Sequence, residues 1–240
     1  MHASLLYTAF ALLPLAIAAP PRPPFYPSRP PQARQNDTSN TTVPESPEAS
    51  SCDVSGVTQP ASTLQPPTPD MQLILIALGQ GTQNYSCSTP TSTPAAIGAV
   101  AQLFNASCAL SANPDTATTP LLSIEESPTI GAHFFVDNTT PDFDIFGLGN
   151  TQAKKVEDAN VPQPSSDVKW LRLQAQTQGT TSSVKEIYRL NTVGGVAPAT
   201  CEGRAAGEIV TVDYQAQYWS MLEKRYGEFQ CVPLIMLSGI

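Results

Sequence analysis

The stretch Glu208–Ser220 reads EIVTVDYQAQYWS, and its apolar side chains recur at every second position. One face of this segment carries Val210, Val212, Tyr214, Ala216 and Tyr218, and the other carries Thr211, Asp213, Gln215 and Gln217. Successive side chains of a β-strand point to opposite faces, so this alternation predicts a half-buried strand.

Other short segments with strand signals lie between residues 71 and 190. They are Met71–Ala77, Ile97–Phe104, Ile130–Val136, Val168–Leu173 and Val184–Leu190. Gly, Pro, Ser and Thr separate them, and no segment shows a sustained apolar stripe at helical spacing. We therefore expect an all-β fold, a single sandwich or barrel-like domain of short, mostly antiparallel strands.

The glycine pair Gly79 and Gly81 follows the first of these segments and resembles the start of a dinucleotide-binding fingerprint. Asn84 replaces the third glycine, and a Ser/Thr/Pro-rich stretch follows where a helix would be needed to hold a pyrophosphate. We therefore expect a β-turn or bulge at these glycines and no nucleotide cofactor.

The chain is expected to have four parts. Residues 1–18 have the pattern of a secretory signal peptide, because the short apolar run Leu5–Ala16 ends in Ala16-Ile17-Ala18. A buried apolar helix is the alternative, although Pro14 would interrupt it. Residues 19–70 are expected to form a disordered Pro/Ser/Thr-rich arm, residues 71–220 the β domain, and residues 221–240 an apolar C-terminal extension.

The C-terminal extension has three readings. Its apolar run Val232–Leu237 is short for the tail of a glycosylphosphatidylinositol signal and lacks a clear small-residue cluster upstream. The alternatives are a final strand packed on the domain and a wrongly predicted end of the gene.

The charge balance excludes one class of partner. The net charge is -8 and the pI is about 4.6. Proteins that bind nucleic acid need clustered Lys and Arg, and the adjacent basic pairs here are Lys154-Lys155 and Lys224-Arg225. We expect no nucleic-acid partner and no membrane span.

The cysteines and sequons fit an extracellular protein. The cysteines are Cys52, Cys87, Cys108, Cys201 and Cys231. In an oxidising compartment most of them are expected in disulfides, with Cys231 as the unpaired one, and no C-x-x-C pair indicates a metal site. Sequons for N-glycosylation occur at Asn36, Asn40, Asn84, Asn105 and Asn138.

Catalysis would have to depend on one histidine. After the leader, His133 is the only histidine, which excludes a multi-histidine metal site. The nearby Asp142 and Asp144 have the spacing of same-face residues on a strand and could act with it in a hydrolase or lyase. A histidine beside Phe134 and Phe135 is more often a packed, hydrogen-bonded residue.

A series of segments between Cys52 and Trp219 carries a family resemblance. The segments are Ile76–Cys87, Ala96–Cys108, Gly131–Phe135, Asp167–Leu173, Glu186–Thr192, Gly194–Cys201 and Tyr214–Trp219. As an ordered set they resemble a family of secreted fungal proteins catalogued as domain of unknown function 3455. The resemblance implies a disulfide between Cys87 and Cys201, which leaves Cys52 and Cys108 as a second pair.

Fungal members of this family are often labelled malate dehydrogenase, and the residues here do not support that label. Such an enzyme needs an NAD-binding parallel sheet, a catalytic His-Asp pair and substrate-binding arginines. This chain instead shows β-strand patterning, a leader and an incomplete glycine motif.

Two functional classes follow from these observations. The preferred one is a secreted, noncatalytic β module, extracellular or in the cell wall, that binds a wall polysaccharide or a small ligand. The alternative is a secreted hydrolase or lyase that uses His133 with Asp142 or Asp144.

Overall fold

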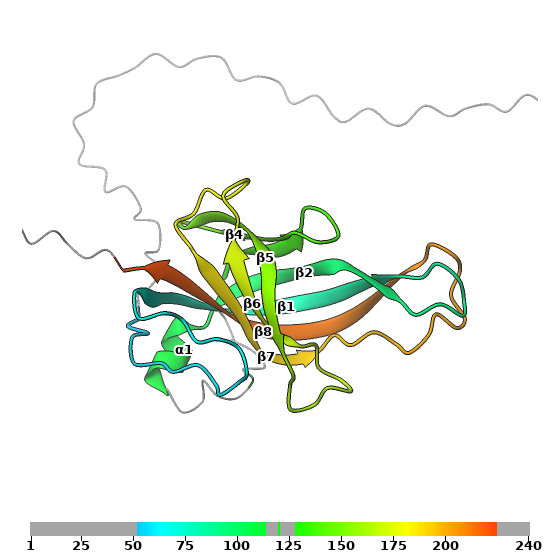
Figure 1. The fold of residues 1–240 in the computed structure, drawn as a ribbon, viewed down its shortest axis with the longest axis horizontal. Coiled ribbons are helices and arrows are strands. Elements are labelled where there is room, and N and C mark those ends of the chain that lie inside the picture. Colours follow the sequence, from blue (N-terminus) through cyan, green and yellow to red (C-terminus); the bar gives the residue numbers. More distant parts are fainter. Residues whose placement is uncertain (1–51, 114–119, 121–127, 225–240) are drawn as a thin grey trace, which may run out of the picture. The chain divides into compact units, whose positions relative to one another are not determined.

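The computed structural model describes residues 52–113, 120 and 128–224, which form a closed barrel of eight antiparallel strands (Figure 1). The strands are β1 (Met71–Ser86), β2 (Ala95–Asn105), β3 (Thr129–Phe135), β4 (Pro141–Ile145), β5 (Gly149–Ala159), β6 (Trp170–Ala175), β7 (Glu186–Gly194) and β8 (Ile209–Glu223). Neighbours in the chain are neighbours in the barrel, and β8 pairs with β1 to close it. The expected all-β, barrel-like fold is confirmed.

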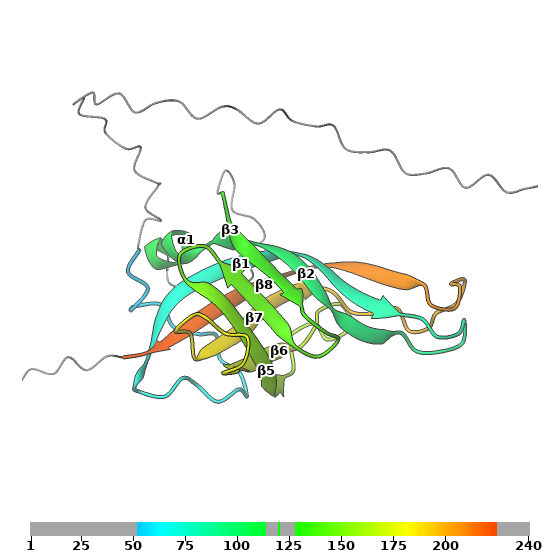
Figure 2. The same ribbon diagram turned by 90° about the horizontal axis from the view of Figure 1, so that it is seen from above.

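The strands β1, β2 and β8 are longer than most of the others and extend together past the rest of the barrel (Figure 2). A disulfide between Cys87 and Cys201 joins the segments that follow β1 and precede β8 at this far end. Both half-cystines are buried with Tyr85 and Val210 in a small cluster of their own. This disulfide is the one that the family resemblance implied.

The two glycines of the incomplete fingerprint lie inside β1, so the expected turn or bulge at this position is wrong. Gly81 faces β2 so closely that an added Cβ would overlap the carbonyl group of Val100. An added Cβ at Gly79 would lie 2.5 Å from Cε2 of Tyr218. These glycines therefore allow close packing inside the barrel and do not mark a strand end.

The barrel interior is filled by side chains from the inner faces of the strands. Small residues on β1 and β2 face large aromatic residues on β4 and β8. This inner cluster includes Ala77, Ala99, Ala101, Leu103, Phe143, Ile145, Leu173, Ile187, Tyr214, Ala216 and Tyr218. The face of Glu208–Ser220 that the sequence predicted to be buried is therefore the inner face of β8, and small and large side chains alternate to fill a narrow barrel.

Part of the outer surface of the barrel is also buried. The segment 52–70, here called the strap, and α1 (Ser107–Ala112) pack over the outer faces of β1, β7 and β8. This outer cluster includes Val54, Leu64, Ile76, Leu78, Leu110, Tyr188, Leu190, Trp219 and Met221. A disulfide between Cys52 and Cys108 links the start of the strap to α1.

The strap lies within residues 19–70, which were expected to form a disordered arm. Its residues are ordered without regular secondary structure, because two apolar side chains, Val54 and Leu64, are buried and a disulfide holds its first residue. The rest of the expected arm, residues 19–51, lies outside the described residues, as do the leader, Asn36, Asn40 and Cys231. The described domain also ends later than expected, because β8 continues to Glu223.

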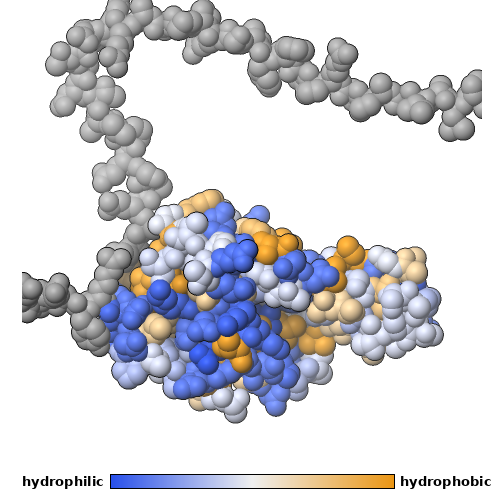
Figure 3. Space-filling model, turned by 45° about the horizontal axis from the view of Figure 1, so that its top comes forward, coloured by the Kyte–Doolittle hydropathy of each residue, from blue (hydrophilic) through white to orange (hydrophobic). Residues whose placement is uncertain are grey.

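Hydrophilic residues and residues of intermediate hydropathy cover much of the face shown in Figure 3, with hydrophobic residues in small separate groups. Among the described residues, the large hydrophobic residues that are exposed belong to different segments: Val100, Val136, Phe146, Val156 and Ile209. Within the described ranges, α1 is six residues long, and no helix there has the length and apolar character that crossing a bilayer requires.

Candidate functional site

His133 lies on the inner face of β3 and is only 3% exposed. Its ring stacks on that of Phe143 with centroids 4.2 Å apart, and its Nδ1 donates a hydrogen bond of 2.8 Å to the backbone oxygen of Asp142. Burial lowers the pKa of His133 to about 4. The imidazole is therefore neutral at neutral pH and enclosed by aromatic rings.

Asp142 and Asp144 share a face of β4, as their spacing predicted, but it is the face opposite to His133. His133 pairs across the strands with Phe143, whereas Asp142 pairs with Phe134 and Asp144 with Ala132. Because side chains alternate along a strand, both carboxylates point out of the barrel while the imidazole points in. The structure does not bring the three side chains together as an acid–base group.

A polar cluster accompanies His133 inside the barrel. The hydroxyl groups of Tyr214 and Tyr218 lie 2.6 Å apart, and burial raises the pKa of each. Arg189 of β7 lies opposite Tyr218 of β8 in the strand register. Its Nη2 donates a hydrogen bond of 2.8 Å to the backbone oxygen of Lys169. Arg189 was not a site candidate in the sequence, because a single basic residue in the alternating segment Val184–Leu190 is typical of a solvent-facing position.

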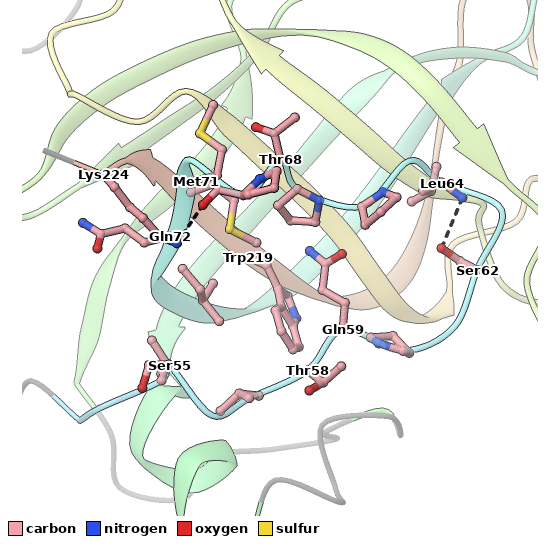
Figure 4. Close-up of a pocket in the computed structure, with 18 of the residues that line it drawn as sticks. Ser55, Thr58, Gln59, Ser62, Leu64, Thr68, Met71, Gln72, Trp219 and Lys224 are labelled. Atoms are coloured by element: carbon pink, nitrogen blue, oxygen red, sulfur yellow. Dashed lines mark hydrogen bonds between the residues drawn. The ribbon is translucent and has the colours of Figure 1, made fainter. Parts of the chain in front are cut away.

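The strap encloses a pocket of about 760 Å³ against the outer face of the barrel (Figure 4). The barrel side is formed by β1 and by Trp219 and Met221 of β8. The strap side is formed by Asp53, Val54, Ser55, Val57, Thr58, Gln59, Pro60, Ala61, Ser62, Leu64, Pro66, Pro67, Thr68 and Pro69. A pocket of this size can hold a ligand of several hundred daltons.

Uncharged polar groups form part of the accessible wall of this pocket, alongside its apolar residues. They include Ser55, Thr58, Ser62, Thr68 and Gln72, all of which are exposed. Hydroxyl and amide groups can both donate and accept hydrogen bonds. Beside them, apolar side chains from the strap and β1 give the pocket a mixed surface.

The amide group of Gln59 points into the ring formed by the strap (Figure 4). Its Nε2 is buried and has no hydrogen-bond partner among the described residues. An unpaired buried donor costs about 1–3 kcal/mol relative to a paired one. The terminal amide torsion of Gln is soft, so a modest rotation can present this donor to a bound molecule.

The two charged residues of the pocket already have partners. The Nζ of Lys224 donates to the backbone oxygen of Pro69 at 2.7 Å. Asp53 accepts from the backbone nitrogen of Ser55 at 2.8 Å, and hydrogen bonds from Ser55 lower the pKa of its carboxyl group. These bonds go to neutral backbone groups, but the lining holds one charged residue of each sign and so has no net charge, which suits an uncharged ligand.

The middle of the strap is held by a polar network on the barrel surface. Glu157 accepts from the backbone nitrogen of Gln65 at 2.9 Å, and the hydroxyl of Tyr188 donates to the backbone oxygen of Gln65 at 2.9 Å. Arg172 binds both oxygens of Glu157 and reaches Glu186 at 2.8 Å. Both the backbone N–H and the backbone oxygen of Gln65 are therefore held by side chains of the barrel.

Three sequons lie among the described residues. Asn138 is exposed in the turn between β3 and β4. The side chains of Asn84 and Asn105 are partly buried, and each accepts a hydrogen bond through Oδ1, from Thr82 and Ser107 respectively. Asn138 is thus the most accessible of the three.

No residue of the strap wall was a site candidate in the sequence. The Pro/Ser/Thr-rich composition of this segment favours disorder, and that signal outweighed the few apolar residues within it. Cys52, Val54 and Leu64 are the signals that could have indicated an anchored segment, because cysteine and large apolar residues are rare in disordered linkers.

Comparison with known proteins gives one family. The family model described as "Protein of unknown function (DUF3455)" matches residues 67–221, from the last residues of the strap almost to the end of β8. No curated protein and no solved structure matches this chain. Since the match covers well over half of the chain and all eight strands of the barrel, the chain belongs to the DUF3455 family, whose function is unknown.

Proposed function

We propose that this protein is a secreted, noncatalytic binding module that holds an uncharged saccharide or a similar small ligand in the strap pocket. The observation that carries the proposal is the pocket itself, with hydroxyl and amide groups on its wall and the buried Nε2 of Gln59, which has no partner in the described part of the chain. A saccharide offers hydroxyl groups to such a wall and an apolar ring face to the residues between them.

The energetics of Gln59 favour an occupied pocket. Its amide nitrogen is removed from solvent and has no hydrogen-bond partner among the residues that the structure describes. A ligand oxygen that accepts from Nε2 would recover the cost of leaving this donor unpaired. Because both charged side chains of the pocket are hydrogen-bonded to backbone groups, a neutral ligand can add hydrogen bonds without breaking these contacts.

The proposal of secretion rests on three features. The leader pattern of residues 1–18 is typical of export, and the sequon at Asn138 is accessible for glycosylation. Two disulfides join Cys52 to Cys108 and Cys87 to Cys201. Disulfides of this kind persist in extracellular compartments and the cell wall.

Tryptophan fluorescence offers a direct test, because the chain has two tryptophans, Trp170 and Trp219. Trp219 lines the pocket and Trp170 does not, so Trp170→Phe leaves a single reporter at the site. We expect chito-oligosaccharides or β-glucan oligosaccharides to change the emission of this variant in a saturable way. A panel in which no oligosaccharide does so at millimolar concentration would contradict the proposal.

Two further variants locate the binding. Gln59→Ala removes the unpaired donor and is expected to weaken binding about tenfold, which corresponds to about 1.4 kcal/mol. Gln65→Ala is the matched control, because Gln65 lies in the strap with its side chain exposed and outside the pocket lining. Equal affinities of the two variants would show that the ligand binds elsewhere.

A further inference from the structure

A second hollow, here called the β8 groove, lies on the outer faces of β1 and β8 beside the end of β7. Its volume is about 660 Å³, and it is lined by Gln80, Gly81, Thr82, Val193, Gly194, Asp213, Tyr214 and Gln215. It shares no lining residue with the strap pocket, which uses Trp219 and Met221 further along β8.

The close approach of β7 to β8 shapes one side of the groove. Gly194 has a φ of 77°, and a Cβ at this position would lie 2.5 Å from the backbone oxygen of Asp213. The backbone nitrogen of Gly194 also donates to Oδ1 of Asp167 at 2.9 Å. Glycine therefore lets the end of β7 lie against β8, and the groove has a fixed backbone wall.

The groove offers hydrogen-bond acceptors and has no cationic side chain in its lining. Asp213 is exposed and has neither an ion pair nor a side-chain hydrogen bond within the described ranges. Oε1 of Gln215 is buried and has no hydrogen-bond partner among the described residues. Thr82 donates its hydroxyl to Asn84, so its oxygen can still accept. No Lys, Arg or His lines the groove.

The spacing of the two main acceptors suits a single cationic donor. Asp213 and Gln215 are two positions apart on one strand, so their side chains leave the same face about 7 Å apart. The N–H bonds of an ammonium group diverge at about 109°, so two oxygens that each accept at about 2.8 Å lie about 4.6 Å apart. Rotations of the two flexible side chains can bring their oxygens to this separation.

We propose that the β8 groove binds a protonated primary amine carried by a hydroxylated ligand, the chemistry of an amino sugar. The ammonium group lies between the carboxylate of Asp213 and Oε1 of Gln215. Gln80 and Thr82 lie beside it and face the hydroxyl groups of the ligand. This site is independent of the strap pocket, because it selects a cation where the strap pocket selects a neutral molecule.

Glucosamine and N-acetylglucosamine are matched probes, because acetylation removes the positive charge and leaves the sugar ring. Both would be titrated into the ¹⁵N-labelled protein at a pH at which the amine is protonated. We expect glucosamine to shift the amide signals of residues 80–82, 193–194 and 213–215, and N-acetylglucosamine to bind there at least about fivefold more weakly. Asp213→Asn should remove this preference.

Glu202→Gln is the control for the loss of one negative charge, because Glu202 is exposed and outside the groove. It should keep the preference for glucosamine. Equal shifts with both sugars, an unchanged preference in Asp213→Asn, or no shift in these residues up to about 50 mM would overturn the proposal. Shifts in residues 53–69 report on the strap pocket separately, so each proposal can fail without the other.

Discussion

His133 illustrates how the surroundings of one residue determine its chemistry. Its imidazole faces Phe135, Phe143 and Tyr218, and its hydrogen-bond partner is a backbone oxygen rather than a carboxylate. A buried neutral imidazole of this kind contributes packing and one hydrogen bond. The acid–base role considered for it in the sequence would require a partner that the register of β3 and β4 places on the other face.

The lowered pKa of His133 predicts a dependence of stability on pH. The pKa falls from 6.5 to about 4 on folding, so the unfolded chain binds more protons between these values. The stability contributed by the neutral imidazole is therefore full above pH 6.5 and is lost as the pH falls toward 4, by about 3 kcal/mol.

Urea unfolding at a series of pH values would measure this dependence. His133→Asn keeps a polar side chain that can donate to the backbone oxygen of Asp142 but does not titrate. We expect this variant to lose about 3 kcal/mol less than the natural protein between pH 6.5 and pH 4. Parallel stability curves for the two proteins would show that His133 does not titrate as a buried group.

Gly81 gives a second prediction for a single residue. Gly81→Ala would place a Cβ against the carbonyl group of Val100, on the backbone of β2, which cannot rotate away. We expect the free energy of unfolding to fall by at least about 2 kcal/mol, measured by thermal or urea denaturation. Gly56→Ala is the control, because nothing lies within 4 Å of its added Cβ. Similar stabilities for the two variants would contradict the packing described for β1 and β2.

The strap is held on the barrel by the Cys52–Cys108 disulfide at its start, by hydrogen bonds to Gln65 in its middle and by Lys224 at Pro69 near its end. Cys52 and Cys108 are partly exposed, whereas Cys87 is 1% and Cys201 0% exposed. A mild thiol reductant should therefore open the Cys52–Cys108 disulfide first, because thiolate attack needs access to the sulfur.

Alkylation followed by mass spectrometry would detect this order. We expect modification of Cys52 and Cys108 at reductant concentrations that leave Cys87 and Cys201 unmodified, and faster proteolysis of residues 53–64 once the disulfide is open. In denaturant both disulfides should be reduced together. Prior reduction of Cys87–Cys201 in the folded protein would refute this account of the two disulfides.

The elements also show which sequence signals were sufficient. The alternation in Glu208–Ser220 identified β8 because its inner face is apolar from Val210 to Tyr218. β4 was not predicted from the sequence, because this strand has five residues, begins with Pro141 and alternates Asp with apolar residues. β5 was not predicted because its inner-facing positions are the small Thr151 and Ala153, while charged residues follow.

The candidate site was harder to predict than the strands. A strand leaves a local pattern in the sequence, whereas the strap pocket depends on contacts between distant segments. Gln65, for example, is bonded to Glu157, which lies 92 positions later. The composition of the strap reports its low intrinsic order, and the anchoring contacts that overcome it are visible only in the fold.

The first and last strands close the barrel. β1 pairs with β8 from Met71 opposite Glu223 to Ser86 opposite Ile209, so closure joins segments that are far apart in the chain. Such nonlocal pairing predicts slow folding, on the order of milliseconds to seconds. Stopped-flow refolding with the Cys87–Cys201 disulfide intact would measure it. Refolding in microseconds would contradict this expectation.

Amide hydrogen exchange of residues 52–70 will show whether this segment is an ordered wall of a ligand pocket. Without ligand, we expect the amides of Val57, which bonds to Val54, and Gln65, which bonds to Glu157, to exchange far more slowly than in an unfolded peptide. A bound oligosaccharide should slow exchange in this segment further. Exchange of the whole segment at unfolded rates, unchanged by every oligosaccharide, would show that residues 52–70 form no ordered pocket wall.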